Sequence, residues 1–91
     1  MTRSSDVEVA YDAWVAARDS VAIEHLAYAE VAKSKKTYIE SSISSGATSE
    51  ARALTDYQAL LQAHSERYLA ALERLGDAFD QLHEAQTSEA K

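Results

Sequence analysis

The sequence predicts an all-α protein, an antiparallel two-helix hairpin of coiled-coil type that dimerises into a four-helix bundle. Two stretches of the chain carry hydrophobic residues at alternating steps of three and four, and a serine-rich segment with a glycine separates them. The 91 residues include no proline and only two glycines, so the composition favours long helices. We expect a single domain over residues 1–91.

The first helix is expected over residues 5–44. Ser5 and Glu8 have the spacing of a capping box, in which each side chain satisfies a free backbone N–H of the other residue. Lysines near residue 35 favour a helix C-terminus, where the helix dipole attracts positive charge. The stripe of this helix consists of Val7, Ala10, Trp14, Ala17, Val21, Glu24, Tyr28, Val31, Lys35 and Tyr38.

The turn is expected over residues 45–48, because Gly46 tolerates the left-handed backbone that often follows a helix. The second helix should cover residues 49–86, and residues 87–91 should form a frayed tail. The stripe of the second helix consists of Leu54, Tyr57, Leu61, His64, Tyr68, Ala71, Leu75, Ala78 and Leu82.

Polar residues interrupt both stripes near the middle of the hairpin. With the turn centred on Gly46, Glu24 faces Tyr68 and Tyr28 faces His64. Because buried polar groups need hydrogen-bond partners, we expect these four side chains to form a buried polar layer that fixes register or oligomeric state. The alternative is a layer that responds to pH, since histidine changes charge near neutral pH.

The first helix carries apolar residues outside its main stripe, more than the second helix can cover. Exposed apolar stripes mark interaction sites, so we expect an interface here with a second copy or another protein. The second helix has fewer apolar residues outside its stripe. The alternative is scattered surface residues that bind nothing. The expected interface consists of Val9, Tyr11, Trp14, Ala16, Ile23, Leu26 and Ala27.

Composition and motifs argue against several classes of function. The net charge of −6 disfavours nucleic acid and anionic membrane surfaces as partners. The sequence has no cysteine, no Glu-x-x-His motif, no nucleophile–histidine arrangement and no glycine-rich phosphate loop. We therefore expect no catalytic residues, no cofactor and no metal. The lack of cysteine and of an apolar leader segment favours a cytoplasmic location.

These observations lead us to expect a non-enzymatic protein–protein interaction module. A small bacterial or phage accessory protein fits best, one that binds and modulates a host protein through the apolar face of the first helix. The abundance of alanine suits such a source. The alternative is a self-assembling structural or assembly component of phage or bacterial origin, and a metal-binding helical bundle is a third possibility.

Overall fold

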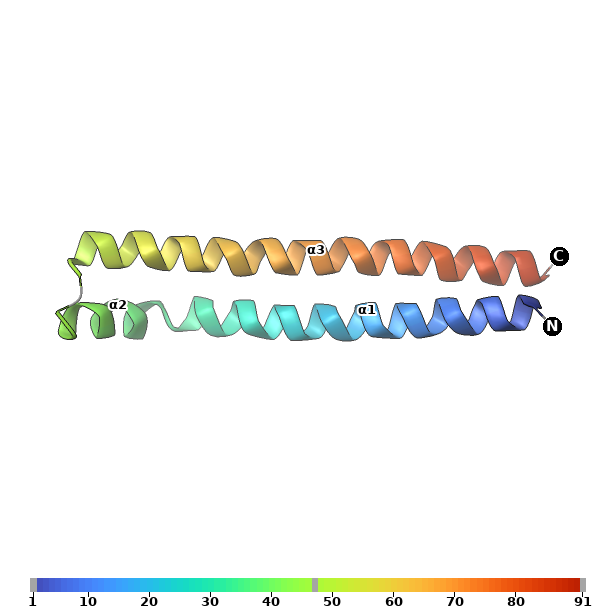
Figure 1. Ribbon diagram of the computed structural model, residues 1–91, viewed down its shortest axis with the longest axis horizontal. Coiled ribbons are helices and arrows are strands. Elements are labelled where there is room, and N and C mark those ends of the chain that lie inside the picture. Colours follow the sequence, from blue (N-terminus) through green and yellow to red (C-terminus); the bar gives the residue numbers. More distant parts are fainter. Residues whose placement is uncertain (1, 47, 91) are drawn as a thin grey trace. The chain divides into compact units, whose positions relative to one another are not determined.

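The protein is helical over nearly all of the residues that its computed structural model describes. These are residues 2–46 and 48–90, with the side chains of residues 6–46 and 48–88. Helix α1 spans Thr2–Lys33, α2 spans Lys35–Ser44 and α3 spans Glu50–Ala90 (Figure 1). The described residues contain no strand, which confirms the predicted all-α class.

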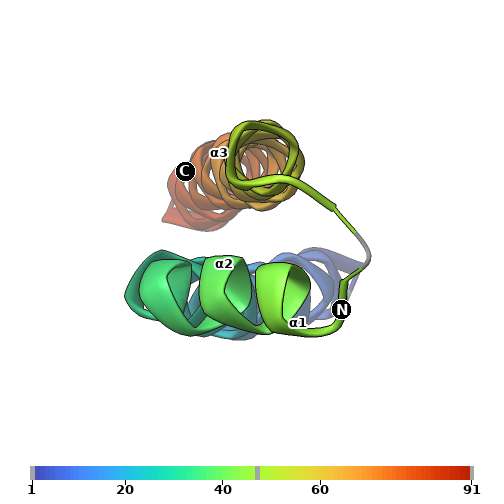
Figure 2. The same cartoon turned by 90° about the vertical axis from the view of Figure 1, so that its left-hand side faces the viewer.

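The helices are divided between two compact units. Unit 1 comprises Met1–Ile23 and Leu69–Lys91, so that the start of α1 lies beside the end of α3. Unit 2 comprises Glu24–Tyr68 and contains the end of α1, all of α2 and the start of α3. Figure 2 shows α2 and the start of α3 side by side in unit 2, with the linker joining them. The single hairpin domain and its dimer remain predictions.

The sequence predicts one helix over residues 5–44, but the structure has two helices there. The chain leaves helical geometry at Ser34, between α1 and α2. The hydroxyl of Tyr57 on α3 donates hydrogen bonds to the carbonyl oxygens of Val31, at 2.8 Å, and Ala32, at 3.3 Å. The Ser34 hydroxyl also donates to the Val31 carbonyl, at 3.0 Å. Side chains that bond helix carbonyls compete with the backbone hydrogen bonds and bend or interrupt a helix.

The outer helix ends also differ from the expected bounds. Helix α1 begins at Thr2, and the side chain of Ser5, on which the predicted capping box depends, is outside the described residues. Helix α3 continues to Ala90, so the described part of the expected frayed tail is helical. The reason is local, since neither proline nor glycine follows Gly76 and nothing there stops a helix. Lys91 lies outside the described residues.

Residues 45–49 link α2 to α3, one residue more than the predicted turn. Gly46 has a φ of +72°, the left-handed backbone that the sequence predicts for it, and its N–H donates to the Ile43 carbonyl at 3.0 Å. The Arg52 N–H donates to the Ser49 hydroxyl at 3.3 Å, which caps the first turn of α3. Ala47, inside the predicted turn, is outside the described residues.

The stripe residues face inward within each unit. All nine on α3 are buried or half-buried, and on α1 and α2 only Lys35 is exposed. The pairing nevertheless differs from the expected one, because the ring of Tyr28 stacks on that of Tyr68, with ring centroids 6.1 Å apart, where Glu24 is expected to face Tyr68. The physical reason is the linker, whose midpoint lies beyond Gly46 and therefore shifts the two partners by about half a turn.

The buried core is small. Among the described residues no large side chain is fully buried, and three of the five buried side chains are alanines. A pair of helices can bury only one stripe on each, which leaves most larger apolar side chains partly in contact with water. The buried side chains are Ala53, Tyr57, Ala71, Ala78 and Leu82.

Candidate interaction surfaces

The predicted interface on α1 is largely open to solvent. Val9, Ile23 and Leu26 are 67%, 65% and 62% exposed. Val9, Ala16 and Ile23 recur every seven residues, so they lie along one line of the helix, and Leu26 follows one turn later. Of the seven predicted positions, Val9, Tyr11, Ala16, Ile23 and Leu26 are exposed, whereas Trp14 and Ala27 are half-buried. A role for them in binding stays a prediction.

Trp14 belongs to a cluster on one edge of α1. Its ring centroid lies 5.9 Å from that of Tyr11, and the guanidinium carbon of Arg18 lies 5.1 Å from the centre of the indole. A cation over an exposed indole contributes about 0.5–1 kcal/mol. The Trp14 ring therefore leans toward the edge that carries Tyr11 and Arg18.

Helix α3 carries exposed apolar side chains that the sequence analysis did not single out. Leu69 and Phe79 are both 56% exposed, and Leu72 is exposed as well. These residues are spaced by three and seven, so they lie on one line of α3, with Gly76 between Leu72 and Phe79. This spacing is the signal in the sequence that would have found them.

Tyr11 and the exposed residues of α3 share one side of unit 1. Tyr11, Leu72 and Phe79 each directly follow an alanine of an inward-facing stripe. In an antiparallel helix pair, positions with the same relation to the stripe lie on the same side of the pair. Tyr11, Leu69, Leu72 and Phe79 therefore form one surface, which we call the Phe79 face.

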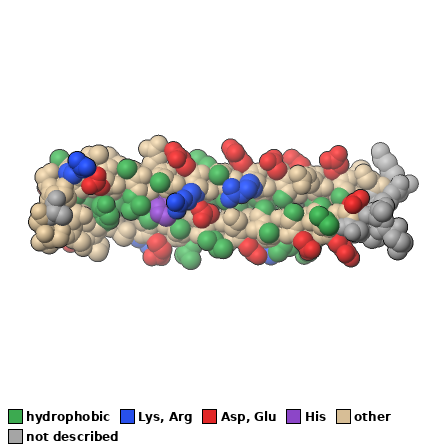
Figure 3. Space-filling view, in the orientation of Figure 1, with side chains coloured by type: hydrophobic (Ala, Val, Ile, Leu, Met, Phe, Trp, Pro, Cys, Tyr) green, Lys and Arg blue, Asp and Glu red, His purple; other side chains and the backbone are tan. Residues whose placement is uncertain are grey.

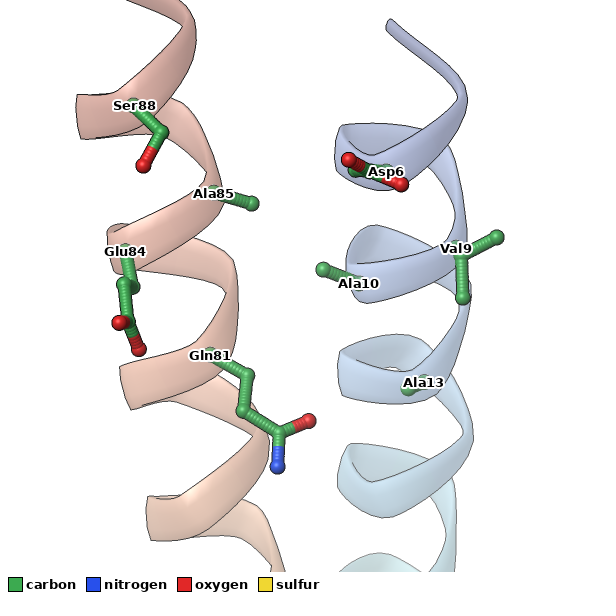
Figure 4. A pocket seen from close by; sticks show the side chains of 8 residues that line it. All are labelled: Asp6, Val9, Ala10, Ala13, Gln81, Glu84, Ala85 and Ser88. Atoms are coloured by element: carbon green, nitrogen blue, oxygen red, sulfur yellow. The ribbon is translucent and has the colours of Figure 1, made fainter. Parts of the chain in front are cut away.

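The opposite side of unit 1 is an open groove of about 390 Å³ between α1 and α3. Ala10 and Ala85 point into it from the two helices (Figure 4). A second groove continues from the first, since Ala13 and Gln81 line both. Space remains here because small side chains meet small ones. We call this surface the alanine groove; its edges carry the charged residues Asp6, Arg74, Asp77 and Glu84.

The expected polar layer lies in unit 2 and is half-buried rather than buried. None of the hydrogen bonds found among the described side chains joins Glu24, Tyr28, His64 and Tyr68. The Tyr68 ring instead packs on Tyr28 and on His25, whose ring centroid is 5.3 Å away. The Nδ1 atom of His64 is shielded from water and, within the described residues, has no hydrogen-bond partner. The Tyr68 ring is thus stacked on Tyr28 and tilted against His25, and the role of the four residues in fixing register or oligomeric state stays a prediction.

Charged side chains are distributed along the surface rather than gathered. Figure 3 shows acidic and basic groups interspersed with hydrophobic ones on the face it displays. Arg52 pairs with Asp56 at 3.1 Å and Lys36 with Glu40 at 4.0 Å, and these side chains are largely exposed. Exposed ion pairs contribute at most about 1 kcal/mol, so they do not determine how the helices pack.

Comparison of the chain with protein families, curated proteins and solved structures finds no match. In residues 2–46 and 48–90, no helix combines the length and the apolar character needed to cross a membrane. The described side chains also include no group of three or more histidines and carboxylates close enough together to hold a metal ion. The exposed apolar side chains on α1 and α3 are the candidates for contact with another molecule.

Proposed function

We propose that this protein is a non-enzymatic protein–protein interaction module that binds another protein through the outer side of α1. The supporting observation is the exposure of Val9, Ile23 and Leu26, each at least 62% open to solvent. Covering apolar side chains contributes about 25 cal/mol for each Å² removed from water. A partner that covers these residues therefore gains affinity from contacts that the free chain does not make.

The chemistry of this surface indicates the kind of partner. Asp12 and Asp19 alternate with Val9, Ala16 and Ile23 along the outer side of α1. An amphipathic helix binds an apolar groove through residues about one turn apart, and charges beside the groove set specificity. The proposed partner offers an apolar groove with lysine or arginine along its edge.

The finer predictions from the sequence belong to the same proposal. In it, the chain forms one antiparallel hairpin, dimerises into a four-helix bundle, and acts in the cytoplasm as a small bacterial or phage accessory protein. The small core supports the dimer, because two helices alone bury no large side chain fully among the described residues. A self-assembling structural component is the alternative, favoured by the exposed apolar side chains on both α1 and α3.

An affinity capture from lysate of the source cell or its host tests the binding role. The tagged chain is compared with a variant that carries Ile23→Lys and Leu26→Lys. A matched control carries Gln58→Lys and Gln62→Lys, which add the same charge at exposed positions of α3. We expect the native chain and the control to retain one protein at fixed stoichiometry, and the α1 variant to lose it.

Two results would contradict this proposal. Equal retention by all three chains would show that the outer side of α1 is not the binding surface. Recovery of the tagged chain alone, or of large homopolymers, would favour the structural role instead.

A further inference from the structure

We propose that two copies of this chain associate through the Phe79 face of unit 1. This inference adds to the proposed function, because it assigns self-association to a surface other than the outer side of α1. Val9 and Ile23 stay free in the resulting dimer to meet another protein. Either proposal can fail without the other.

The Phe79 face is apolar on both helices of unit 1. Phe79 and Leu69 are more than half exposed, and Leu72 and Tyr11 also reach the solvent. The other positions on this side are small, apolar or basic over the middle of unit 1. They are Val15, Arg18, Ala22, Gly76 and His83.

The charge pattern favours a second copy as the occupant. Each chain has a net charge of −6, so two copies repel each other wherever acidic residues meet. The alanine groove brings three acidic residues, Asp6, Asp77 and Glu84, and one basic residue, Arg74, to its edges. On the side of the Phe79 face, Glu8 lies about one turn before Tyr11 and Arg18 carries the opposite charge, while the described positions on this side from Tyr11 to Ala22 and from Leu69 to His83 include no acidic residue. Of the two sides of unit 1, it is the one that another acidic chain of this sequence can approach.

The shape of the Phe79 face also suits contact with itself. A Cβ atom added at Gly76 would meet nothing within 4 Å, so the surface of α3 is open at this position between Leu72 and Phe79. A twofold axis brings the same surface patch together from both copies. Because Gly76 has no side chain, the two copies of α3 can then approach each other closely beside it.

The size of the face suits a weak dimer. Its four exposed side chains offer roughly 400 Å² per copy, and their neighbours add to this area. A standard protein interface buries about 800 Å² per partner. We therefore expect a dissociation constant of about micromolar for the full-length chain.

Sedimentation velocity over a range of concentrations tests the proposal. The native chain is compared with a variant carrying Leu72→Gln and Phe79→Gln. The matched control carries Val9→Gln and Ile23→Gln, which remove two apolar side chains that are more exposed than Leu72 and Phe79 from α1 of the same unit. We expect the α3 variant to weaken dimerisation by about tenfold or more, and the control to leave it unchanged. Added salt should tighten the native dimer, since it screens the repulsion between two acidic chains.

A single introduced cysteine gives a second test that does not require the glutamine variants to fold. The chain has no cysteine of its own, and the open space at Gly76 accommodates Gly76→Cys. Under mild oxidation this variant should form disulfide-linked dimers, while Asp77→Cys, at the edge of the alanine groove, should not.

Several outcomes would overturn the proposal. A native chain that stays monomeric at about 100 μM would mean that a second copy is not the occupant. Loss of the dimer in the Val9/Ile23 control, or equal loss in both variants, would place the contact elsewhere. Equally fast cross-linking at Gly76→Cys and Asp77→Cys would show no preference for the Phe79 face. None of these outcomes bears on capture of a partner through Ile23 and Leu26.

Discussion

Tyr57 connects α3 to the end of α1 within unit 2. It is buried, and its hydroxyl bonds to two carbonyl groups at the end of α1. A hydrogen bond contributes about 1 kcal/mol net, and those two carbonyls would lose a donor on mutation. We expect Tyr57→Phe to lower the free energy of unfolding by about 1–2 kcal/mol in urea denaturation.

Tyr38→Phe is the matched control for that substitution. The Tyr38 ring lies 5.8 Å from the Tyr57 ring, but no hydrogen bond of its hydroxyl is found among the described residues. The free energy of unfolding of the Tyr38→Phe variant should stay within about 0.5 kcal/mol of the native value. Equal losses in the two variants would show that the Tyr57 hydroxyl contributes nothing specific.

In contrast to the Tyr57 hydroxyl, the Nδ1 atom of His64 has no hydrogen-bond partner among the described residues. Its Nδ1 is shielded from water and lacks a partner among the described residues, which costs about 1–3 kcal/mol relative to a satisfied group. We expect His64→Leu to raise the free energy of unfolding by about 1 kcal/mol. Thermal and urea unfolding at pH 7 measure the change.

The same His64→Leu variant tests whether the layer with Glu24 specifies the assembly. If the variant has the same oligomeric mass in solution as the native chain and a higher free energy of unfolding, the histidine does not set the oligomeric state. A variant that is less stable, or that forms several oligomers, would contradict our reading of an unsatisfied side chain and support the specificity role predicted from the sequence.

At the scale of helices and turns, the two glycines should respond in opposite directions to alanine. Gly46 has a φ of +72°, where a Cβ is strained, so Gly46→Ala should cost about 1–2 kcal/mol. Gly76 lies inside α3 with open space at its Cβ position, so Gly76→Ala should add about 1 kcal/mol of helix stability. The free energies of unfolding of the two variants are compared by circular dichroism in urea, at protein concentrations below the expected dissociation constant of the dimer. A loss in both variants would mean that Gly76 is needed for a close contact.

The inward-facing stripes could be predicted from the sequence because they depend on local spacing alone. A step of three and four places Leu61 and Tyr68 on one side of α3 whatever the rest of the chain does. The left-handed turn at Gly46 is equally local. The end of α1 at Ser34 could not be predicted this way, because the hydroxyl that competes for its carbonyls comes from Tyr57, far along the chain.

The pairing of the helices and the position of the exposed surfaces could not be predicted from residue spacing alone. The middle of the linker lies one residue beyond Gly46, and the Tyr68 ring packs on Tyr28 where Glu24 is expected. The Phe79 face is difficult to predict from the sequence because Leu69, Leu72 and Phe79 form only a short line on α3, and single exposed apolar residues are common on protein surfaces. Only the packing of α1 against α3 in unit 1 shows that Tyr11 joins them on the same side.

For the whole molecule, the small core leads us to expect that stability depends on association. No large side chain is fully buried among the described residues, while Leu69, Leu72 and Phe79 stay open to water. A partner that binds only the folded chain stabilises it, and a second copy does so in proportion to concentration. We expect the Tm of the native chain to rise by about 3–5 °C for each tenfold increase in protein concentration.

Differential scanning calorimetry from about 5 to 500 μM measures this dependence across the expected dimer range. The Leu72→Gln and Phe79→Gln variant should have a lower Tm than the native chain at each concentration, because its weaker dimer contributes less to stability. The Val9→Gln and Ile23→Gln variant should keep the native slope. A native Tm that is constant over this range would mean that the chain folds without a second copy. The exposed apolar residues of α3 would then not be a contact between two copies.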